Sequence, residues 1–348
     1  MARAVTPHGS GSPDVSIIIC TWNNCRRLAV TLDALARCAT PSDPAWDLVL
    51  VDNNCRDETP AVARAFRDRL PLVYVEERRQ GLSRARNAGL RAAAGRLIVF
   101  ADDDITPATG WLTIYWTAYL ERPRGFYFGG PLVPEFESAP PEPALGRLAH
   151  APVTGLDWGS HPRVLEPHER FLGANWACPA DALRRVGGFD VELGLDASLG
   201  RRRVGEEWDL MERLRAAGIR PWYLPDARVA HFVPERKCRL PYLASNWEAH
   251  GHASTLRATT NTPFFHRRPH LRPICADGGP RIAGAPLRAY LAAGRFGLRW
   301  LAARARGRDG YEEYATWRFC LGAIRGHGER WRQRSDPARG SSDRAAVS

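Results

Sequence analysis

Three consecutive aspartates, Asp102, Asp103 and Asp104, follow directly on an apolar run of the kind that forms a buried strand. Carboxylates at this spacing repel one another, and burying them without a compensating charge would be strongly unfavourable. The cluster therefore predicts either a solvated turn that caps a following helix or a site for a divalent cation. Because Mg²⁺ takes one or two carboxylates and leaves positions for phosphate oxygens, the second interpretation implies a phosphate-bearing ligand.

An alternation of strands and helices is expected to position these acids. Four β-branched or apolar segments alternate with amphipathic ones, which predicts βαβ units and a parallel sheet. The expected strands cover residues 15–20, 46–51, 72–76 and 97–101, and the expected helices cover residues 24–37, 58–69 and 82–94. Ligands of such sheets bind beyond the carboxyl ends of the strands. Polar groups follow three of these strands, at residues 21–24, 52–54 and 102–104.

Several classes of protein are disfavoured by what the sequence lacks. No Gly-x-Gly-x-x-Gly follows the first strand and no Gly-x-x-x-x-Gly-Lys occurs, which argues against a dinucleotide-binding fold and a P-loop NTPase. The eight cysteines show neither Cys-x-x-Cys nor the spacing of zinc ligands. Nothing near Met1 resembles a signal peptide, and the first apolar run is too short to cross a membrane. A cytoplasmic, reducing location is expected.

The pattern changes beyond Pro107. An aromatic-rich helix is expected over residues 111–120 and a strand over 126–131, followed by a proline-rich irregular segment over 134–170. Later elements are expected as a strand at 171–178, helices at 181–186 and 205–214, and strands at 221–225 and 227–232.

Eight short motifs occur in an order and at intervals that resemble family 2 glycosyltransferases of the GT-A fold. They are Val15 to Asn24, Val51 to Asn54, Gly81 to Gly89, Phe100 to Ile105, Gly173 to Asn175, Gly187 to Asp190, Gly205 to Leu210 and Pro225 to His231. The resemblance covers about residues 14 to 235. It implies an α/β fold with a Rossmann-like, mostly parallel sheet flanked by helices, and an inverting enzyme that uses a nucleotide-sugar donor.

The resemblance also implies contacts to the nucleotide. Asp52 would accept a hydrogen bond from the base, which makes a UDP-sugar the default donor, and Thr21 and Asn23 would line the same pocket. Arg86 would reach a phosphate. Two of these residues also have simpler interpretations, since Asp52 is a common turn cap and Arg86 a common surface residue that packs its aliphatic stem.

A metal site follows from the same resemblance. Asp104 would hold Mg²⁺ or Mn²⁺ on the diphosphate, Asp102 would contact the ribose or sugar with Asp103 beside it, and His231 would be a distant metal or phosphate ligand. A single histidine at a strand end is also often structural.

For catalysis, the resemblance places a carboxylate near the start of the helix that follows the acceptor loop. The family pattern there is Glu-Asp, whereas this chain has Glu206 and Glu207, so Glu207 is the expected base and carries one methylene more. Both acids would also favour a helix N-terminus without any catalytic role. Asn175, Trp176 and Trp208 are expected to contact the acceptor, with core packing as the alternative for the tryptophans.

The expected organisation is a disordered segment at 1–13, a donor-binding half at 14–105, an acceptor-binding half at 106–240, a basic helical extension at 241–334 and a disordered tail at 335–348. The net charge is +11, and residues 281–348 hold 14 Arg against 6 Asp or Glu. Within this basic region, 286–306 and 311–325 are expected to be helices. They would pack on the catalytic domain or on a second subunit, or would contact an anionic membrane surface peripherally through 286–325.

The expected partners are a nucleotide-sugar donor and a hydroxyl-bearing acceptor, such as a glycan, a lipid-linked intermediate or a secondary metabolite. A nucleotidyltransferase that acts on sugar phosphates is the alternative enzyme class, but no glycine-rich Lys/Arg signature follows the first strand. The positive charge also suggests a non-catalytic nucleic-acid or membrane-binding protein. Nucleic acid is not expected as a partner, because the basic residues carry no known nucleic-acid-binding motif.

Overall fold

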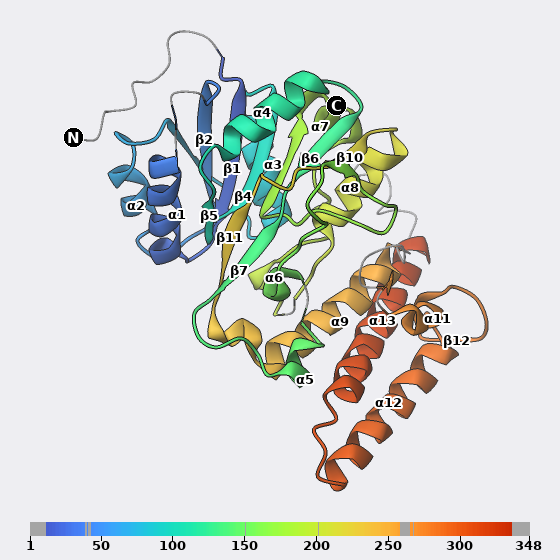
Figure 1. Cartoon of the computed structure of the whole chain (residues 1–348). Helices are drawn as coiled ribbons and strands as arrows, with labels where there is room; N and C mark the ends of the chain where they lie inside the picture. Colours follow the sequence, from blue (N-terminus) through green and yellow to red (C-terminus); the bar gives the residue numbers. More distant parts are fainter. Residues whose placement is uncertain are drawn as a thin grey trace. The chain divides into compact units, whose positions relative to one another are not determined.

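The computed structural model describes residues 12–38, 40, 43–149, 151–200, 202–257, 265–266 and 268–335. The disorder predicted for 1–13 and 335–348 therefore falls almost entirely outside the described residues. The chain divides into two compact units (Figure 1). Unit 1 contains the chain up to Ser138, Ala151–Leu199 and Glu206–Pro234, and unit 2 contains Ala139–His150, Gly200–Gly205 and the chain from Glu235 onward.

Unit 1 is built on an eight-stranded sheet with the order β3-β2-β1-β4-β9-β6-β10-β8. The first four strands of this order are parallel to one another, and β1 and β2 are paired along their whole length, over seven residue pairs. Their bounds are β1 (Val15–Thr21), β2 (Trp46–Asp52), β3 (Leu72–Glu76) and β4 (Leu97–Asp102), and the connecting helices are α1 (Cys25–Cys38), α2 (Thr59–Ala65) and α3 (Leu82–Ala92). The predicted α/β fold is confirmed.

The second half of unit 1 extends this sheet and adds a smaller one. Strand β9 (Asn175–Pro179) runs antiparallel to β4 and to β6 (Phe126–Gly129), and β10 (Arg220–Tyr223) then pairs with β6 and with β8 (Arg163–Val164). The smaller sheet has the order β5 (Ile105–Pro107), β11 (Val229–Val233), β7 (Leu132–Phe136). The helices are α4 (Trp111–Glu121), α6 (Ala151–Thr154), α7 (Ala180–Val186) and α8 (Glu206–Ala216), with a 3-10 turn at Ala197–Leu199.

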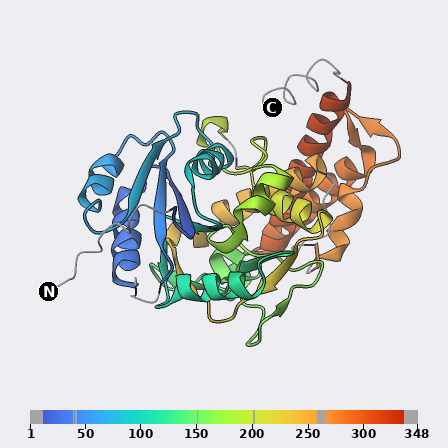
Figure 2. The same ribbon diagram turned by 90° about the horizontal axis from the view of Figure 1, so that it is seen from above.

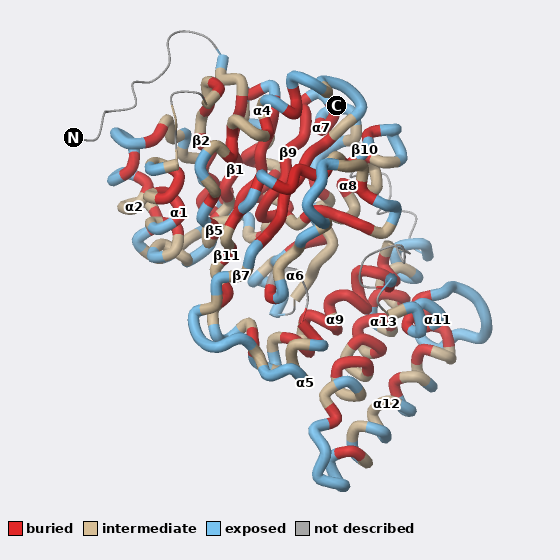
Figure 3. The backbone as a smooth tube through the Cα atoms, in the orientation of Figure 1, coloured by how far each residue is buried: buried red, intermediate tan, exposed pale blue. Residues whose placement is uncertain are grey.

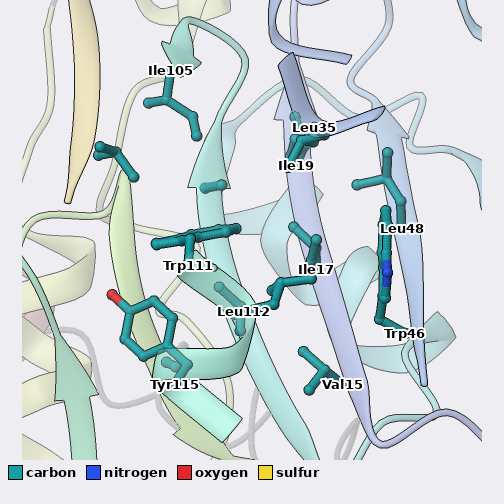
Figure 4. Packing of buried hydrophobic residues seen from close by; sticks show 14 of the residues in the cluster. Val15, Ile17, Ile19, Leu35, Trp46, Leu48, Ile105, Trp111, Leu112 and Tyr115 are labelled. Carbon is teal, nitrogen blue, oxygen red and sulfur yellow. The ribbon is translucent and has the colours of Figure 1, made fainter. Parts of the chain in front are cut away.

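Both faces of the large sheet are buried, which explains why its strands are apolar without alternation. Ile17 and Ile19 of β1 belong to the core cluster that contains Leu35 of α1 and Trp111 of α4 (Figure 4). Ile18, between them, points to the opposite cluster, which contains Ala85 and Ala88 of α3 and Leu210 and Leu214 of α8. Figure 2 shows the helices of unit 1 on both sides of the strands.

Four expected elements differ from the structure, one of which is the helix expected over 311–325, which continues to Ser335. The helix expected over 58–69 ends at Ala65, and turns follow. The segment expected to be irregular, 134–170, includes most of β7 and all of α5 (Pro143–Gly146), α6 and β8. The strand expected at 171–178 begins only at Asn175. Phe171, whose apolar side chain suggested an earlier start, lies outside the strand and packs edge-on against Tyr127, with ring centroids 5.7 Å apart.

Unit 2 is mainly helical, with α9 (Leu240–Leu256) packed along α13 (Tyr311–Ser335). Glycines allow this close approach, since a Cβ on Gly251 would clash with the Phe319 carbonyl and one on Gly322 with the Glu248 carbonyl. The remaining elements are α5, α11 (Arg272–Cys275), α12 (Leu287–Ala305), the hairpin β12 (Arg281–Ile282) and β13 (Ala285–Pro286), and 3-10 turns at Glu235–Cys238 and Pro269–Leu271. Figure 3 shows α9 largely buried, α13 buried over part of its length and α12 more exposed. No helix of the described residues is long and apolar enough to span a bilayer.

Candidate active site

The polar residues predicted to share one edge of the sheet do so. In the parallel register, Thr21 of β1 lies beside Asp52 of β2, and Cys20 lies beside Asp102 of β4. The carboxyl ends of the three strands are therefore level, and the turns that follow them start from the same edge. This is the edge at which parallel α/β sheets bind ligands.

Asp102, Asp104 and His231 form a cluster that could hold a metal ion. One ligand-type atom from each residue lies within 4.8 Å of the others, and His231 Nε2 lies 3.3 Å from Asp104 Oδ1. Backbone pairing brings the histidine there: His231 of β11 lies opposite Ile105 of β5, and the Phe232 N–H donates to the Asp104 carbonyl at 2.9 Å. Two carboxylates and one imidazole suit a divalent cation of the Mn²⁺ type, so the residues present fit the implied metal.

Asp103 points to a different set of partners. Its two carboxylate oxygens accept hydrogen bonds from Thr21 Oγ1 at 2.5 Å and from Asn24 Nδ2 at 2.8 Å. Burial, with the negative charge of Asp104 adding to it, raises the pKa of Asp103 to about 7. Asp103 and Thr21, both expected to contact the donor, are thus bonded to each other and fasten the turn after β1 to the end of β4.

Asp52 and Asn23 hold the loop that follows β2. Asp52 is buried, and its carboxylate accepts hydrogen bonds from the Cys55 backbone N–H at 2.7 Å and from the Tyr74 hydroxyl at 2.5 Å. Asn23 adopts a positive φ of 50° and its Oδ1 accepts from the Arg56 N–H at 2.7 Å. Both residues lie at the expected edge, and their contact with a base stays a prediction.

Arg86 lies inside the protein and not at the surface. Its Nη1 lies 2.8 Å from Glu206 Oε1 and its Nη2 lies 3.6 Å from Asp102 Oδ1. Burial alone would lower the pKa of Arg86, but the surrounding carboxylates, Glu207 foremost, raise it above its ordinary value. The guanidinium connects the metal-ligand cluster to the first turn of α8, and its contact with a phosphate stays a prediction.

Glu206 and Glu207 are the first two residues of α8, and they differ in environment. Glu206 is buried against Arg86, whereas Glu207 is only half-buried. Burial, together with the neighbouring charge of Glu206, raises the pKa of Glu207 to about 8, although Arg86 acts in the opposite direction. A carboxylate whose pKa lies near neutrality is well matched to general-base chemistry, so Glu207 is the better placed of the two acids.

Two of the three expected acceptor residues lie in the core and not at the site surface. Asn175 accepts hydrogen bonds from Trp111 Nε1 and the Tyr115 hydroxyl and donates to two backbone carbonyls. Trp176 is fully buried and stacks on Phe100, with ring centroids 4.6 Å apart. Their side chains support the sheet beneath the site and offer no face to an acceptor. Trp208 is half-buried on α8, directly after Glu207.

Asn53 and Asn87, for which the sequence predicted no role, position the loops around the site. Asn53 Oδ1 accepts from the Gly81 N–H at 2.9 Å, and its Nδ2 donates to the Glu77 carbonyl at 3.0 Å. Asn87 makes a reciprocal pair of hydrogen bonds with the backbone of Phe189. The sequence pattern that could have identified Asn53 is an amide side chain directly after a strand. For Asn87 it is an amide within a helix that faces a glycine-rich turn.

Gly173 provides the space that Arg86 and Glu207 occupy. A Cβ at this position would clash with Arg86 Nη2 and would lie 2.8 Å from Glu207 Oε1.

Because Arg86 is held by two carboxylates, we expect the Gly173→Ala substitution to displace Glu207 and to lower kcat by about 10- to 100-fold, with little change in donor KM. Steady-state kinetics would test this, with Gly146→Ala as a control in which the nearest atom to the new Cβ is 3.8 Å away. Equal kcat values for both variants would contradict it.

Comparison with known proteins agrees with this arrangement. The family model for glycosyl transferase family 2 matches residues 16–189. The chain is 30% identical over 230 residues to the validoxylamine A glucosyltransferase of Streptomyces hygroscopicus subsp. jinggangensis, which covers 60% of this chain and 52% of that protein. It is 29% identical over 245 residues to the pre-mycofactocin glycosyltransferase of Mycobacterium tuberculosis, covering 66% and 45%. The chain thus spans about half the length of these curated relatives.

The fold is also shared with a solved structure, that of the mannosyltransferase PcManGT from Pyrobaculum calidifontis in complex with GDP-mannose and Mn²⁺. The TM-score is 0.53 at 22% sequence identity, over 92% of this chain and 88% of that one. This likeness shows the fold, which is the GT-A fold. The chain belongs to the glycosyl transferase family 2.

Proposed function

We propose that this protein transfers a sugar from a nucleotide-sugar donor to a hydroxyl acceptor with inversion at the anomeric carbon. The observation that carries the proposal is the charged network at the sheet edge. Arg86 contacts Asp102 of the candidate metal cluster and Glu206 of α8, and this connection supports Glu207, the next residue of α8, as the base.

Asp104, Asp102 and His231 are the residues that would hold Mg²⁺ or Mn²⁺ in this proposal. A bound divalent ion would supply positive charge against the diphosphate, whose negative charge grows as the bond to the sugar breaks. The presence of Mn²⁺ with GDP-mannose in the PcManGT structure supports a metal of this type. Thr21 and Asp103 fasten the β1 turn against the cluster and would keep its carboxylates in place.

Glu207 would take the proton from the acceptor hydroxyl as its oxygen attacks the anomeric carbon. The nucleoside diphosphate leaves from the opposite face of the sugar, so a single displacement inverts the anomeric centre. Arg86 and Glu206 would orient Glu207 through the buried ion pair at the start of α8. Trp208, the residue after Glu207, is the remaining candidate for contact with the acceptor.

The donor base and the acceptor are proposed only as classes. Asp52 at the end of β2 supports a base with an N–H to donate, and a UDP-sugar is the default. A glycan, a lipid-linked intermediate and a secondary metabolite are the proposed acceptors. Validoxylamine A and pre-mycofactocin, which appear in the names of the two relatives, support keeping a secondary metabolite in this set.

A donor panel tests the proposal. UDP-, GDP-, ADP- and dTDP-sugars would be incubated with the protein and Mn²⁺ or Mg²⁺, with release of nucleoside diphosphate as the readout. We expect metal-dependent release from at least one donor, suppressed by EDTA, and NMR of the first-formed sugar should show an inverted anomer. Release from none of them would contradict the proposal. Formation of pyrophosphate from a nucleoside triphosphate and a sugar phosphate would instead indicate the nucleotidyltransferase alternative.

The pH dependence of the reaction follows from Glu207. Its pKa is raised to about 8 by burial and by the charge of Glu206, and only the deprotonated carboxylate can accept a proton. We therefore expect kcat/KM to reach a plateau above this pKa and to fall by about tenfold per pH unit below it. A profile of kcat/KM against pH in a constant-ionic-strength buffer would test this, and a rate that does not change between about pH 6 and pH 9 would contradict it.

A further inference from the structure

Helix α12 presents leucines to solvent where a surface helix ordinarily presents polar residues. The leucine ridge (Leu291, Leu298 and Leu301) is 65%, 69% and 56% exposed. These positions are seven and three residues apart, so they lie along one side of the helix. Scattered exposed leucines are ordinary on protein surfaces, but three along one helical stripe form a continuous apolar strip.

The opposite side of α12 is the one that packs. Ala289, Ala293 and Ala303 are buried, and the Trp300 ring stacks on Trp317 of α13, with centroids 5.6 Å apart and planes 11° apart. The apolar face, which was expected from the sequence either to pack against protein or to contact a membrane surface, is therefore left exposed among the described residues. Trp300 contacts α13 from the same side of α12 as the buried alanines, and no element among the described residues covers the leucine ridge.

The charges on α12 itself are all positive, and the exposed Asp309 lies beyond the end of the helix. Helix α12 carries four arginines and no aspartate or glutamate, and Arg295 and Arg299 are exposed beside the ridge. Arg306 and Arg308 follow directly after the helix and are exposed as well. Another exposed apolar residue, Ile282 of the β12–β13 hairpin, lies near the first turns of α12 and is 53% exposed. Its carbonyl accepts a hydrogen bond from the Tyr290 hydroxyl of α12.

We propose that α12 lies in the surface of an anionic lipid bilayer, with the leucine ridge and Ile282 inserted among the acyl chains near the headgroups. An exposed apolar stripe flanked by arginines is the pattern of an interfacial helix, and each basic residue near an anionic surface adds to the attraction. A second copy of the chain is a poorer occupant, because two ridges pairing antiparallel would bring arginine flanks together without an acidic residue on either helix. The inference rests on α12 and the hairpin alone and needs no glycosyl transfer.

Co-sedimentation of the full chain with lipid vesicles tests it. Vesicles of phosphatidylcholine with phosphatidylglycerol would be compared with vesicles of phosphatidylcholine alone, at about 0.05 M and 0.5 M salt. One variant combines Leu291→Ser, Leu298→Ser and Leu301→Ser, and another combines Arg295→Gln with Arg299→Gln. The matched control combines Val30→Ser with Leu120→Ser, which removes similarly exposed apolar side chains from unit 1. Thermal unfolding of each variant would verify its fold.

We expect binding to anionic vesicles at low salt and much weaker binding to neutral ones. The triple leucine variant should lower the partition coefficient by at least about tenfold, the arginine variant should lower it several-fold, and the control should bind like the wild type. Three results would overturn the proposal: no binding at low salt, unchanged binding of the triple variant, or a dimer in light scattering that the triple variant dissociates. Since no donor is used, a failure here is distinct from a failure of the proposed reaction.

Discussion

The Glu207→Gln variant should transfer sugar about 10²- to 10⁴-fold more slowly than the wild type, with donor affinity unchanged within a few-fold. Glutamine keeps the size and polarity of the side chain but cannot accept the acceptor's proton at neutral pH. Donor binding should survive because the residues proposed to hold the nucleotide and metal lie at or just beyond the ends of β1, β2 and β4, on α3 and on β11, and not on α8. Single-turnover rates and calorimetric donor binding would measure the two quantities separately.

Asp209→Asn is a matched control for this variant. Asp209 also lies in the first turn of α8, but its carboxylate pairs with Arg213 four residues later, away from Arg86. We expect it to retain near wild-type transfer. Glu206→Gln differs from both, because it removes the buried partner of Arg86 and should lower the melting temperature as well as the rate. A fully active Glu207→Gln variant would show that another group takes the proton.

The second large effect is expected from Asp104→Ala, which should weaken Mn²⁺ binding by at least about 100-fold. The substitution removes one of two carboxylates from a three-ligand cluster, and even residues that merely support metal ligands contribute 10- to 100-fold in affinity. Because the metal would hold the diphosphate, Mn²⁺-dependent binding of a nucleoside diphosphate should be lost with it. Electron paramagnetic resonance of Mn²⁺ would report the bound fraction without any need for activity.

Asp103→Asn tests whether the cluster is assigned correctly. Asp103 is the neighbour of Asp104 in sequence, yet its oxygens face Thr21 and Asn24. Mn²⁺ affinity should therefore stay within a few-fold of the wild type in this variant, with some loss of thermal stability. Equal loss of Mn²⁺ in Asp103→Asn and Asp104→Ala would indicate that the acids bind metal as a group, which contradicts the separate roles proposed here.

The sequence was sufficient for the donor-side framework because that part is repetitive. Each strand from β1 to β4 is a short apolar run that ends in polar residues, and parallel register then places residues such as Thr21 and Asp52 side by side. Side-chain direction within this edge was not predictable from spacing. Whether Asp103 faces the metal cluster or Thr21, and whether Arg86 faces solvent or Glu206, depends on contacts between segments about 80 to 120 residues apart.

Unit 2 was harder to predict for a different reason. Helix α9 buries most of its surface, including His250 and Trp247, so it has no amphipathic period from which a packed face could be read. In α12 the period is clear, but three leucines lie on the exposed side, and alanines together with Trp300 lie on the packed side. Hydrophobic patterning identifies an apolar face without identifying what covers it, and only the position of α13 decided which face of α12 is buried.

The central claim is that a nucleotide sugar binds at this sheet edge through a metal held by Asp102, Asp104 and His231. A crystal structure of the protein soaked with UDP and Mn²⁺, with anomalous diffraction recorded for manganese, tests it most directly. The expected result is a manganese peak coordinated by these three residues and by diphosphate oxygens, with the base beside Asp52 and an open space in front of Glu207. Manganese or nucleotide bound elsewhere, with the Asp102, Asp104 and His231 side chains unligated, would contradict the claim.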